Sequence, residues 1–358
     1  MIEKKVTILD VAKKLGVATS TISRALQDHH SISQKTKKLV KKTVEEMKYS
    51  PNNVAASLRR GKGNTIGVII PKVNSNFMSN CIFGIESITY PSGYSLIICQ
   101  SNESLEKEVD NIRALINSQV SGILMSFSNE TDNSNHLKII TDKNIPLVLF
   151  DRVDNSSDID CIINDDYQIS KNVIDHLTEK GYKNIAFICG PTNLSVYKDR
   201  LNGFKNGLNS NNLKIQKQWV FEGIEKGEWI APTKTKKGIK TKDEAHSITL
   251  NLFNNNNNNN ERPDAIFCTG DTLALGAITA LKEININIPD EVGVVGYSND
   301  TFSNIISPSL TSIEQFPQEI GSNAARILID IIESENTDHA KKTILIKSKL
   351  MVRESSNK

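Results

Sequence analysis

The chain has 358 residues and a net charge of +2, and its 38% apolar and 23% charged content is that of a globular protein with two or three domains. No stretch approaches the roughly 18–20 apolar residues of a membrane span, and the N-terminus lacks the apolar core of a secretory signal, so we expect a cytoplasmic protein with no membrane partner. The five cysteines stand singly in apolar runs without a Cys-x-x-Cys pair, which indicates reduced core thiols.

Charge is unevenly distributed along the chain. Residues 1–63 contain 14 lysines and arginines against 5 aspartates and glutamates, whereas the remainder contains 29 against 36. A basic head on an acidic body predicts that only the head meets a polyanion such as DNA. A Lys-rich helix that is merely solvated is the alternative explanation.

The first two predicted helices form a compact pair. Thr7 is the expected N-cap of the first helix, and the Asp10 carboxylate three residues later favours its free N–H groups. Gly16 ends this helix where the backbone turns into the left-handed region. Two short helices joined through a glycine predict a helix-turn-helix, whose second helix, residues 19–26, suits groove edges and phosphates. The outer face of that helix carries Thr19, Ser20, Thr21, Ser23 and Arg24.

A third helix is expected from Ser33, its N-cap, to about Lys48, where it completes the core of the head. Its apolar positions are Leu39, Val40, Val44 and Met47, and its other face carries Lys37, Lys38, Lys41 and Lys42.

A short hinge helix follows the head. Ser50 can cap it and Pro51 can occupy its first position, but it is too short to be stable alone and it precedes a flexible joint at residues 61–64. We therefore divide the chain into a DNA-binding head, residues 1–49, a hinge, residues 50–63, and a body, residues 64–358.

Three segments of the head and hinge carry a shared pattern. Residues 6–26 read VTILDVAKKLGVATSTISRAL, residues 32–36 read ISQKT, and residues 49–58 read YSPNNVAASL. This pattern resembles the LacI/GalR family of bacterial repressors. The resemblance implies a homodimeric, sequence-specific transcription regulator that binds a near-palindromic operator in double-stranded DNA and responds to a small-molecule effector.

The resemblance also implies roles for residues in the head and hinge. Thr19, Ser20 and Arg24 would contact the major groove, and Thr21 and Ser23 would lie near phosphates. Leu58 would be the apolar wedge in the minor groove, unless it is an ordinary anchor on the body. The full DNA-binding set that we predict is Thr7, Thr19, Ser20, Thr21, Ser23, Arg24, Asn53, Ala55, Leu58 and Arg59.

Two positions depart from the family pattern. Ala18 stands where the family usually has a serine that caps the recognition helix, a loss of about 1 kcal/mol of helix stability unless Thr19 caps instead. Ala56 stands where many members have a hinge arginine, for which Arg59 and Arg60 are the candidates to compensate.

The body alternates buried strands with amphipathic crossover helices, which predicts an α/β fold with doubly wound parallel sheets. The strand runs are residues 66–71, 94–99, 122–126, 146–151, 185–190, 265–269 and 292–297. The length suits two subdomains with a cleft between them. By resemblance, the body is periplasmic-binding-protein-like, with the chain crossing between subdomains near residues 160, 292 and 320.

Strand ends supply the effector-site candidates, because ligands of such sheets lie beyond the carboxyl ends of the strands. Residues 73–78, VNSNFM, resemble a family loop, and this resemblance implies that Phe77 and Met78 stand at the rim, where an aromatic can stack on a sugar or base. Asp151 can accept hydrogen bonds from ligand hydroxyls. Residues 200–204, RLNGF, match a family signature that implies a bidentate clamp by Arg200. The effector-binding set that we predict is Phe77, Met78, Asp151, Arg200, Asp271 and Ser298.

Each candidate has a structural alternative. Asp151 and Asp271 could be helix or turn caps, and Arg200 could be one partner of a structural ion pair. Gly270 and Ser298 replace an asparagine and an aspartate of the family pattern, so the usual sugar contacts are incomplete. We nevertheless expect a carbohydrate effector, either a sugar or a sugar phosphate.

Two rival classes of protein share parts of these patterns. A solute-binding protein of a transport system has the same body, but it would need an export signal and no basic head. An α/β enzyme is disfavoured because no nucleophile elbow, phosphate-binding loop or His-Glu-x-x-His motif is present and the six histidines are scattered. We expect no catalytic residue, no cofactor and no metal.

Control of DNA binding is expected to run through the dimer. Cleft closure on the effector would change how the two bodies sit together, and so whether the hinges order on DNA; Phe83, Ile85 and Ile88 are the dimer-contact candidates. The Lys-rich residues 226–242 look like a surface insertion, and the run Asn254–Asn260 looks like a flexible loop.

Overall fold

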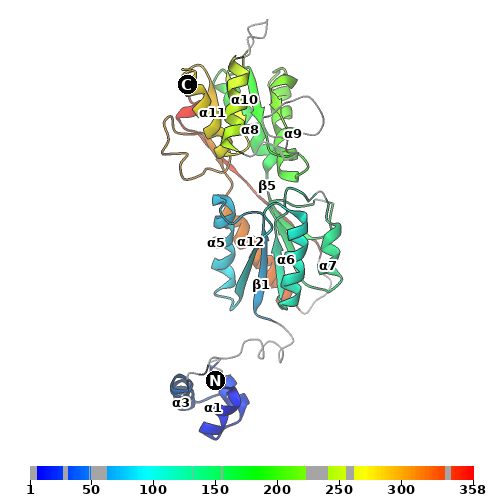
Figure 1. Ribbon diagram of the computed structural model, residues 1–358, viewed down its shortest axis with the longest axis vertical. Helices are drawn as coiled ribbons and strands as arrows, with labels where there is room; N and C mark the ends of the chain where they lie inside the picture. The colour runs from blue at the N-terminus through cyan, green and yellow to red at the C-terminus, as the bar shows by residue number, and fades with distance from the viewer. Residues whose placement is uncertain are drawn as a thin grey trace. The chain divides into compact units, whose positions relative to one another are not determined.

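The computed structural model describes residues 6–26, 31–47, 49, 63–131, 133–154, 156–222, 241–254, 262–334 and 340–358. The chain divides into two compact units, Met1–Gly63 and Asn64–Lys358 (Figure 1). Most of the Lys-rich insertion and of the asparagine run lies outside the described residues.

The head is a three-helix unit built as its sequence predicts. It comprises α1 (Ile8–Leu15), α2 (Thr19–Leu26) and α3 (Gln34–Glu46). The Asp10 carboxylate accepts hydrogen bonds from the Thr7 backbone N–H at 2.8 Å and from its hydroxyl at 2.7 Å, and Gly16 ends α1 at φ 64°. The buried core consists of Val11, Ala12, Ile22, Ala25 and Val40.

Two predictions for α3 are wrong. Leu39 is 52% exposed instead of facing the core, and Lys37 is buried instead of lying on the solvated face. Both errors have one cause. The inward face of α3 is formed by Val40 and Thr43, and Lys37, three residues before Val40, lies on that same face. Leu39 does not lie on it. A long lysine stem can be covered by neighbours in such a position.

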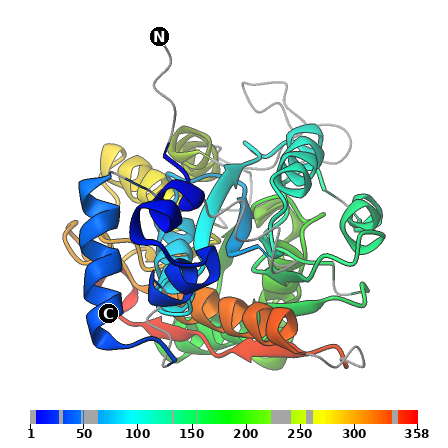
Figure 2. The same cartoon turned by 90° about the horizontal axis from the view of Figure 1, so that it is seen from below.

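The first sheet of the body has six parallel strands in the order β11-β5-β4-β3-β1-β2. Their bounds are β1 (Thr65–Ile70), β2 (Ser95–Gln100), β3 (Gly122–Met125), β4 (Leu147–Phe150), β5 (Asp160–Asn164) and β11 (Thr343–Ile346). One face packs on α5 (Asn76–Thr89) and α12 (Pro317–Glu333), and the other on α6 (Leu105–Asn117) and α7 (Lys138–Thr141). Figure 2 shows α12, in orange, lying along β11, in red.

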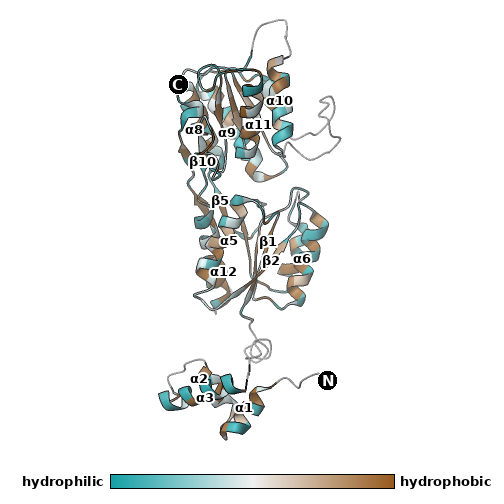
Figure 3. Ribbon diagram, turned by 60° about the vertical axis from the view of Figure 1, so that its left-hand side comes forward, coloured by the Kyte–Doolittle hydropathy of each residue, from teal (hydrophilic) through white to brown (hydrophobic). Residues whose placement is uncertain are grey.

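The second sheet has four parallel strands in the order β7-β6-β8-β9. Their bounds are β6 (Ile185–Ile188), β7 (Val220–Phe221), β8 (Ala265–Cys268) and β9 (Gly293–Val295). Helices α8 (Asp166–Glu179) and α9 (Ser195–Ser210) cover one face, and α10 (Lys242–Asn254) and α11 (Asp271–Glu283) cover the other. The apolar strands therefore lie between helices whose outer faces are polar (Figure 3). We call these two halves of the body the first lobe and the second lobe.

The end of the chain is built into the second lobe. Strand β12 (Lys349–Met351) pairs antiparallel with β10 (Ser312–Glu314), and the 3-10 turn Glu354–Ser356 follows. Ser355 is fully buried and donates through its hydroxyl to the Val294 carbonyl at 2.6 Å. Arg353 binds the Leu310 carbonyl at 2.6 Å. These last residues therefore complete the second lobe from outside its own stretch of chain.

The chain crosses between the lobes after β5, again between β10 and α12, and a third time between β11 and β12. The crossings predicted near residues 160 and 320 lie close to the first two. The third crossing, predicted near residue 292, is wrong in position: β9 pairs with β8 inside the second lobe, and the chain crosses instead between β11 and β12.

Helices α5 and α12 approach closely through two glycines. A Cβ added to Gly321 would lie 2.0 Å from the Cys81 carbonyl oxygen, and one added to Gly84 would lie 2.1 Å from the Gln318 carbonyl oxygen. The two backbones therefore touch where any side chain would separate them.

The start of α2 offers a direct test of the capping argument. Thr19 is the first helical residue, and the Ala18 carbonyl accepts from the Thr21 and Ile22 backbone N–H groups, so Ala18 occupies the N-cap position. Replacing Ala18 by serine should stabilise the head by about 1 kcal/mol, because its hydroxyl can accept from a free N–H group. The measurement is the urea midpoint of the isolated head against the wild type; an unchanged midpoint would contradict it.

Candidate effector site and DNA-binding face

The predicted reading face of α2 points away from the core of the head. Ile22 and Ala25 are buried, whereas Ser20 and Arg24 are exposed and Thr19, Thr21 and Ser23 are half-buried. Thr7, at the start of α1, is exposed as well. The small hydroxyls and the single guanidinium can therefore reach a ligand outside the head.

Lysines on α3 add positive charge to the head. Lys38, Lys41 and Lys42 are exposed, and only Lys42 has an ion pair, a long contact of 4.0 Å to Glu46, among the pairs that the structure gives for these three. Exposed ion pairs of this length contribute little to stability, so the positive charge of these lysines stays available to a polyanion. The predicted hinge contacts Asn53, Ala55, Leu58 and Arg59 lie outside the described residues.

Left-handed backbone gathers at the strand ends of the body. Among the described residues, ten non-glycine residues have a positive φ, and four of them directly follow helices, where such caps are ordinary. The other six lie in connections after strands: Asn102, Glu103, Asp151, Ser298, Asn299 and Phe316. Such conformations cost about 1–3 kcal/mol each and concentrate at functional sites, so this face is the candidate effector site.

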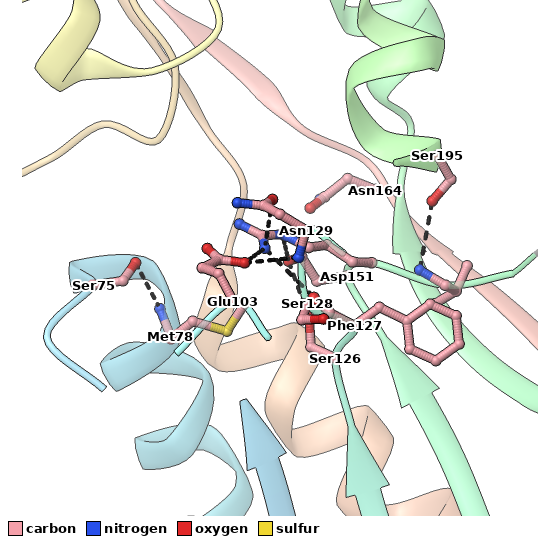
Figure 4. Close-up of polar contacts among 12 residues, drawn as sticks. Ser75, Met78, Glu103, Ser126, Phe127, Ser128, Asn129, Asp151, Asn164 and Ser195 are labelled. Atoms are coloured by element: carbon pink, nitrogen blue, oxygen red, sulfur yellow. Dashed lines mark hydrogen bonds and ion pairs between the residues drawn. The ribbon is translucent and has the colours of Figure 1, made fainter. Parts of the chain in front are cut away.

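Asp151 lies at the end of β4 in the first lobe. Its side chain is 8% exposed, its φ is 61°, and its carboxylate accepts from the Ser126 hydroxyl at 3.4 Å. Burial raises the pKa of Asp151 to about 6, against the opposing influence of the Arg152 and Arg200 guanidiniums. Its carboxylate is thus held in a dry site with few protein partners (Figure 4).

Arg152 and Glu103 form a second cluster beside Asp151, which sequence reasoning missed. The Arg152 Nη1 donates to Glu103 Oε2 at 2.8 Å and to Asn129 Oδ1 at 3.3 Å. Glu103 also accepts from the Asn129 backbone N–H at 2.9 Å. Figure 4 shows Glu103 and Asn129 converging from different strand ends. The signal in the sequence is the run Phe150–Asp151–Arg152, because Arg152 follows the same strand end as Asp151.

Arg200 of the second lobe belongs to a buried cluster of its own. Its Nε donates to Asp166 Oδ1 at 2.9 Å, its Nη1 donates to the Thr269 carbonyl at 3.3 Å, and its guanidinium lies 3.7 Å from the centre of the Tyr297 ring. Tyr297 donates a short hydrogen bond to the same Asp166 oxygen. The structure thus supports the ion-pair alternative for Arg200, which still leaves guanidinium N–H groups for a ligand.

The two lobes meet at this face. The charges of Arg200 and Asp166 act on Asp151, and the charge of Arg152 acts on Tyr197 of the second lobe. Direct contacts join the lobes too. Asn193 donates to the Asn129 carbonyl at 2.8 Å. The Ser195 hydroxyl, labelled in Figure 4, accepts from the Val153 backbone N–H at 3.5 Å. We call the set Glu103, Asp151, Arg152, Asp166, Arg200 and Tyr297 the interlobe site.

Three other predicted effector residues lie apart from that set. Met78 is buried in the apolar core of the first lobe, so its placement at the rim is wrong, while Phe77 is half-buried against the same core. Ser298 is half-buried, and its hydroxyl donates to Gln315 Oε1 at 3.3 Å.

Asp271 is a structural residue in this fold. It is 1% exposed, and its two carboxylate oxygens accept from the Ser303 hydroxyl at 2.7 Å, the Ser312 hydroxyl at 2.6 Å and the Asp300 backbone N–H at 2.7 Å. With its oxygens occupied, Asp271 holds the segment after β9 in place. The capping alternative therefore describes it better than a ligand contact.

Protonation of Asp151 should be visible in the stability of the body. Its pKa is raised from 3.8 in the unfolded chain to about 6, so its contribution is fully present below about pH 4 and is lost as the pH rises through about 6. Asp151→Asn removes the ionisation and should gain on the order of 3 kcal/mol in free energy of unfolding over the wild type above pH 6. Urea unfolding at pH 4 and pH 7 measures this difference; a gain that is equal at both pH values would exclude it.

Metal chemistry and membrane insertion find no support in the described part of the chain. Among these residues no group of three or more His, Cys, Asp or Glu side chains could hold a metal ion. The same residues contain no helix that is both long and apolar enough to span a bilayer.

Three family models together match most of the chain. Residues 7–52 match the family model described as bacterial regulatory proteins, lacI family. Residues 63–229 match that of the periplasmic binding proteins and sugar binding domain of LacI family, and residues 174–356 match a periplasmic binding protein-like domain.

Curated relatives and solved structures agree with these matches. The chain is 31% identical over 349 residues to the HTH-type transcriptional repressor PurR of Actinobacillus pleuropneumoniae serotype 3, covering 98% of each chain, and 31% identical over 354 residues to PurR of Vibrio vulnificus. Its fold is similar to the lac repressor dimer bound to operator and the anti-inducer ONPF, at TM-score 0.83, 23% identity and 99% and 100% coverage. It is also similar to a CelR–cellobiose complex, at TM-score 0.70, 22% identity and 98% and 100% coverage.

Proposed function

The chain belongs to the LacI family of bacterial regulatory proteins, DNA-binding transcription repressors and not enzymes, and on that premise we propose that a carbohydrate bound at the interlobe site controls its binding to a near-palindromic operator. A regulator of this kind acts on DNA in the cytoplasm. The observation that supports the proposal is the group of charged side chains from both lobes, with Asp151 on one side and Arg200 on the other.

We assign the DNA contact to the outer face of α2. Ser20 and Arg24 are exposed on the side opposite Ile22, so both can meet base edges or phosphates while the helix stays packed. The basic face of α3 adds contacts to phosphates that do not depend on the base sequence. The hinge residues named above complete the proposed surface.

We assign the control step to the connections between the lobes. Closure of the lobes on a ligand would change the contacts Asn193–Asn129 and Ser195–Val153, which join the two lobes. The three chain crossings also join the lobes, at their facing edges. A ligand that binds one arrangement better than the other shifts the population toward it, which typically changes DNA affinity by 1–3 kcal/mol.

The operator complex is proposed to contain two copies of the chain. Phe83 on α5 is 58% exposed, and Ile97 and Ile98 on the edge strand β2 are 36% and 45% exposed. Of the other two predicted contacts, Ile85 is fully buried in the core of its own lobe and cannot meet a partner, and Ile88 is partly buried there. Sedimentation that shows only monomer at micromolar concentration would contradict this part.

The test of DNA binding is selection from a random double-stranded library with the full chain, followed by affinity measurements on the selected site. We expect a near-palindromic site, and Arg24→Ala should weaken binding to it by about 10–100-fold, the worth of one good side-chain contact. Lys107→Ala, which removes an exposed cation from the body, is the matched control and should change affinity little. Selection of no site would refute the proposed function.

A further inference from the structure

Both guanidiniums of the interlobe site are already neutralised by the protein. Arg152 pairs with Glu103 at 2.8 Å, with 14% and 13% of the two side chains exposed. Arg200 pairs with Asp166 at 2.9 Å, with 6% and 5% exposed. Buried pairs of this kind are costly to separate, because each partner would remain as an uncompensated charge.

Asp151 is a third carboxylate with no close cation of its own. Its nearest ion-pair contact is 3.8 Å to Arg152 Nε, on a guanidinium whose Nη1 is held by Glu103, and its hydrogen bond from Ser126 is long at 3.4 Å. Asp300 lies near the same face of the second lobe and receives one hydrogen bond, from Asn76 of the first lobe at 3.0 Å. The described residues of this face therefore carry more carboxylates than guanidiniums.

We infer that the effector carries no net negative charge and presents hydroxyl donors to Asp151, so that a neutral sugar fits this site and a phosphorylated sugar does not. The inference rests on the proposed function and narrows its ligand class. An anionic group would meet an ionised carboxylate or would have to displace Glu103 or Asp166 from its arginine.

Hydroxyl groups match the remaining hydrogen-bonding capacity of the site. An ionised carboxylate can only accept, so Asp151 selects a ligand that donates. A guanidinium has five N–H donors, of which Arg200 uses two in the contacts to Asp166 and Thr269. Hydroxyl groups of a sugar can donate to Asp151 and accept from Arg200 without breaking either ion pair.

The first experiment titrates the full chain by calorimetry with neutral pentoses and hexoses and with their phosphates. A neutral sugar should bind at least 100-fold more tightly than its own phosphate. Asp151→Asn should weaken binding of the neutral sugar by about 10–100-fold and reduce the preference for this sugar over its phosphate. The asparagine side chain has the shape of aspartate but lacks the charge that repels an anion. Asp110→Asn, an exposed carboxylate on α6 that pairs with Arg113, is the matched control. A phosphate that binds as tightly as its parent sugar would overturn the inference.

A second experiment separates failure of the inference from failure of the proposed function. A metabolite extract is divided on an anion-exchange column, and each fraction is tested for a shift of the thermal midpoint that Asp151→Asn abolishes. If no pure sugar binds but the unretained fraction shifts the midpoint, the carbohydrate proposal fails and the charge inference holds. A shift confined to the retained, anionic fraction overturns the inference while leaving an effector site. Response to neither fraction overturns both.

Discussion

Gly321→Ala is expected to destabilise the body by about 3 kcal/mol or more, the upper part of the range for overpacked cores. The added Cβ would lie 2.0 Å from the Cys81 carbonyl oxygen, and this atom belongs to the backbone of α5 and cannot rotate away. Relief therefore requires α5 and α12 to move apart along their length, which opens the apolar core that they share with the first sheet. The loss appears in the urea midpoint of the body.

Ser322→Ala is the control for this prediction. It also introduces alanine into α12, one residue later, where the serine hydroxyl only bonds back to the Glu319 carbonyl of the same helix. Its effect should stay within about 0.5 kcal/mol. If Gly321→Ala lowers the free energy of unfolding no more than Ser322→Ala does, α5 and α12 can accommodate the added Cβ and the prediction is wrong.

Asp166→Ala is expected to lower the free energy of unfolding of the body by about 3–5 kcal/mol, because it leaves the Arg200 guanidinium buried without a counter-charge. The Tyr297 hydroxyl loses its acceptor as well, so two buried donors become unsatisfied. Binding of any effector to the interlobe site should be lost with it, since Arg200 is then free to move. Chemical unfolding and calorimetry of the same preparation measure the two effects.

Asp166→Asn separates charge from hydrogen bonding at that position. The amide oxygen can still accept from Arg200 Nε or the Tyr297 hydroxyl, so the loss should be clearly smaller than for alanine. Equal losses for the two variants would mean that the negative charge alone stabilises the cluster. No measurable loss for Asp166→Ala would mean that Arg200 can reach water, contrary to its 6% exposed side chain.

The sequence was informative where a pattern is local. Capping at Thr7, the left-handed Gly16 and the apolar strand runs each depend on residues a few positions apart, and all three appear in the structure. Strand β11 was missed because it is short, half-exposed, and pairs in register with a strand some 180 positions earlier, as Thr343 with Cys161. No periodicity within the strand itself indicates such a partner.

The same distinction holds at the interlobe site. Asp151 could be singled out because it directly follows the end of β4, and Arg200 because it begins the run RLNGF, which resembles a family signature. Glu103 could not, because it lies in a turn after an edge strand and its partner Arg152 is 49 positions away in the chain. The role of Asp271 depends on two donors from the connection after β9 and one from the first residue of β10, which only the folded second lobe brings to it.

The three crossings also have a consequence for how the protein is made. Neither lobe is one continuous stretch, since β11 completes the first sheet and residues 349–356 complete the second lobe. During synthesis the head can fold as soon as it emerges, whereas the first lobe waits for residues 343–346 and the second lobe for residues 349–356 to leave the ribosome. A prematurely terminated chain would thus have a folded head attached to an unfinished body, and its exposed apolar strands would direct it to degradation before it could occupy DNA without control.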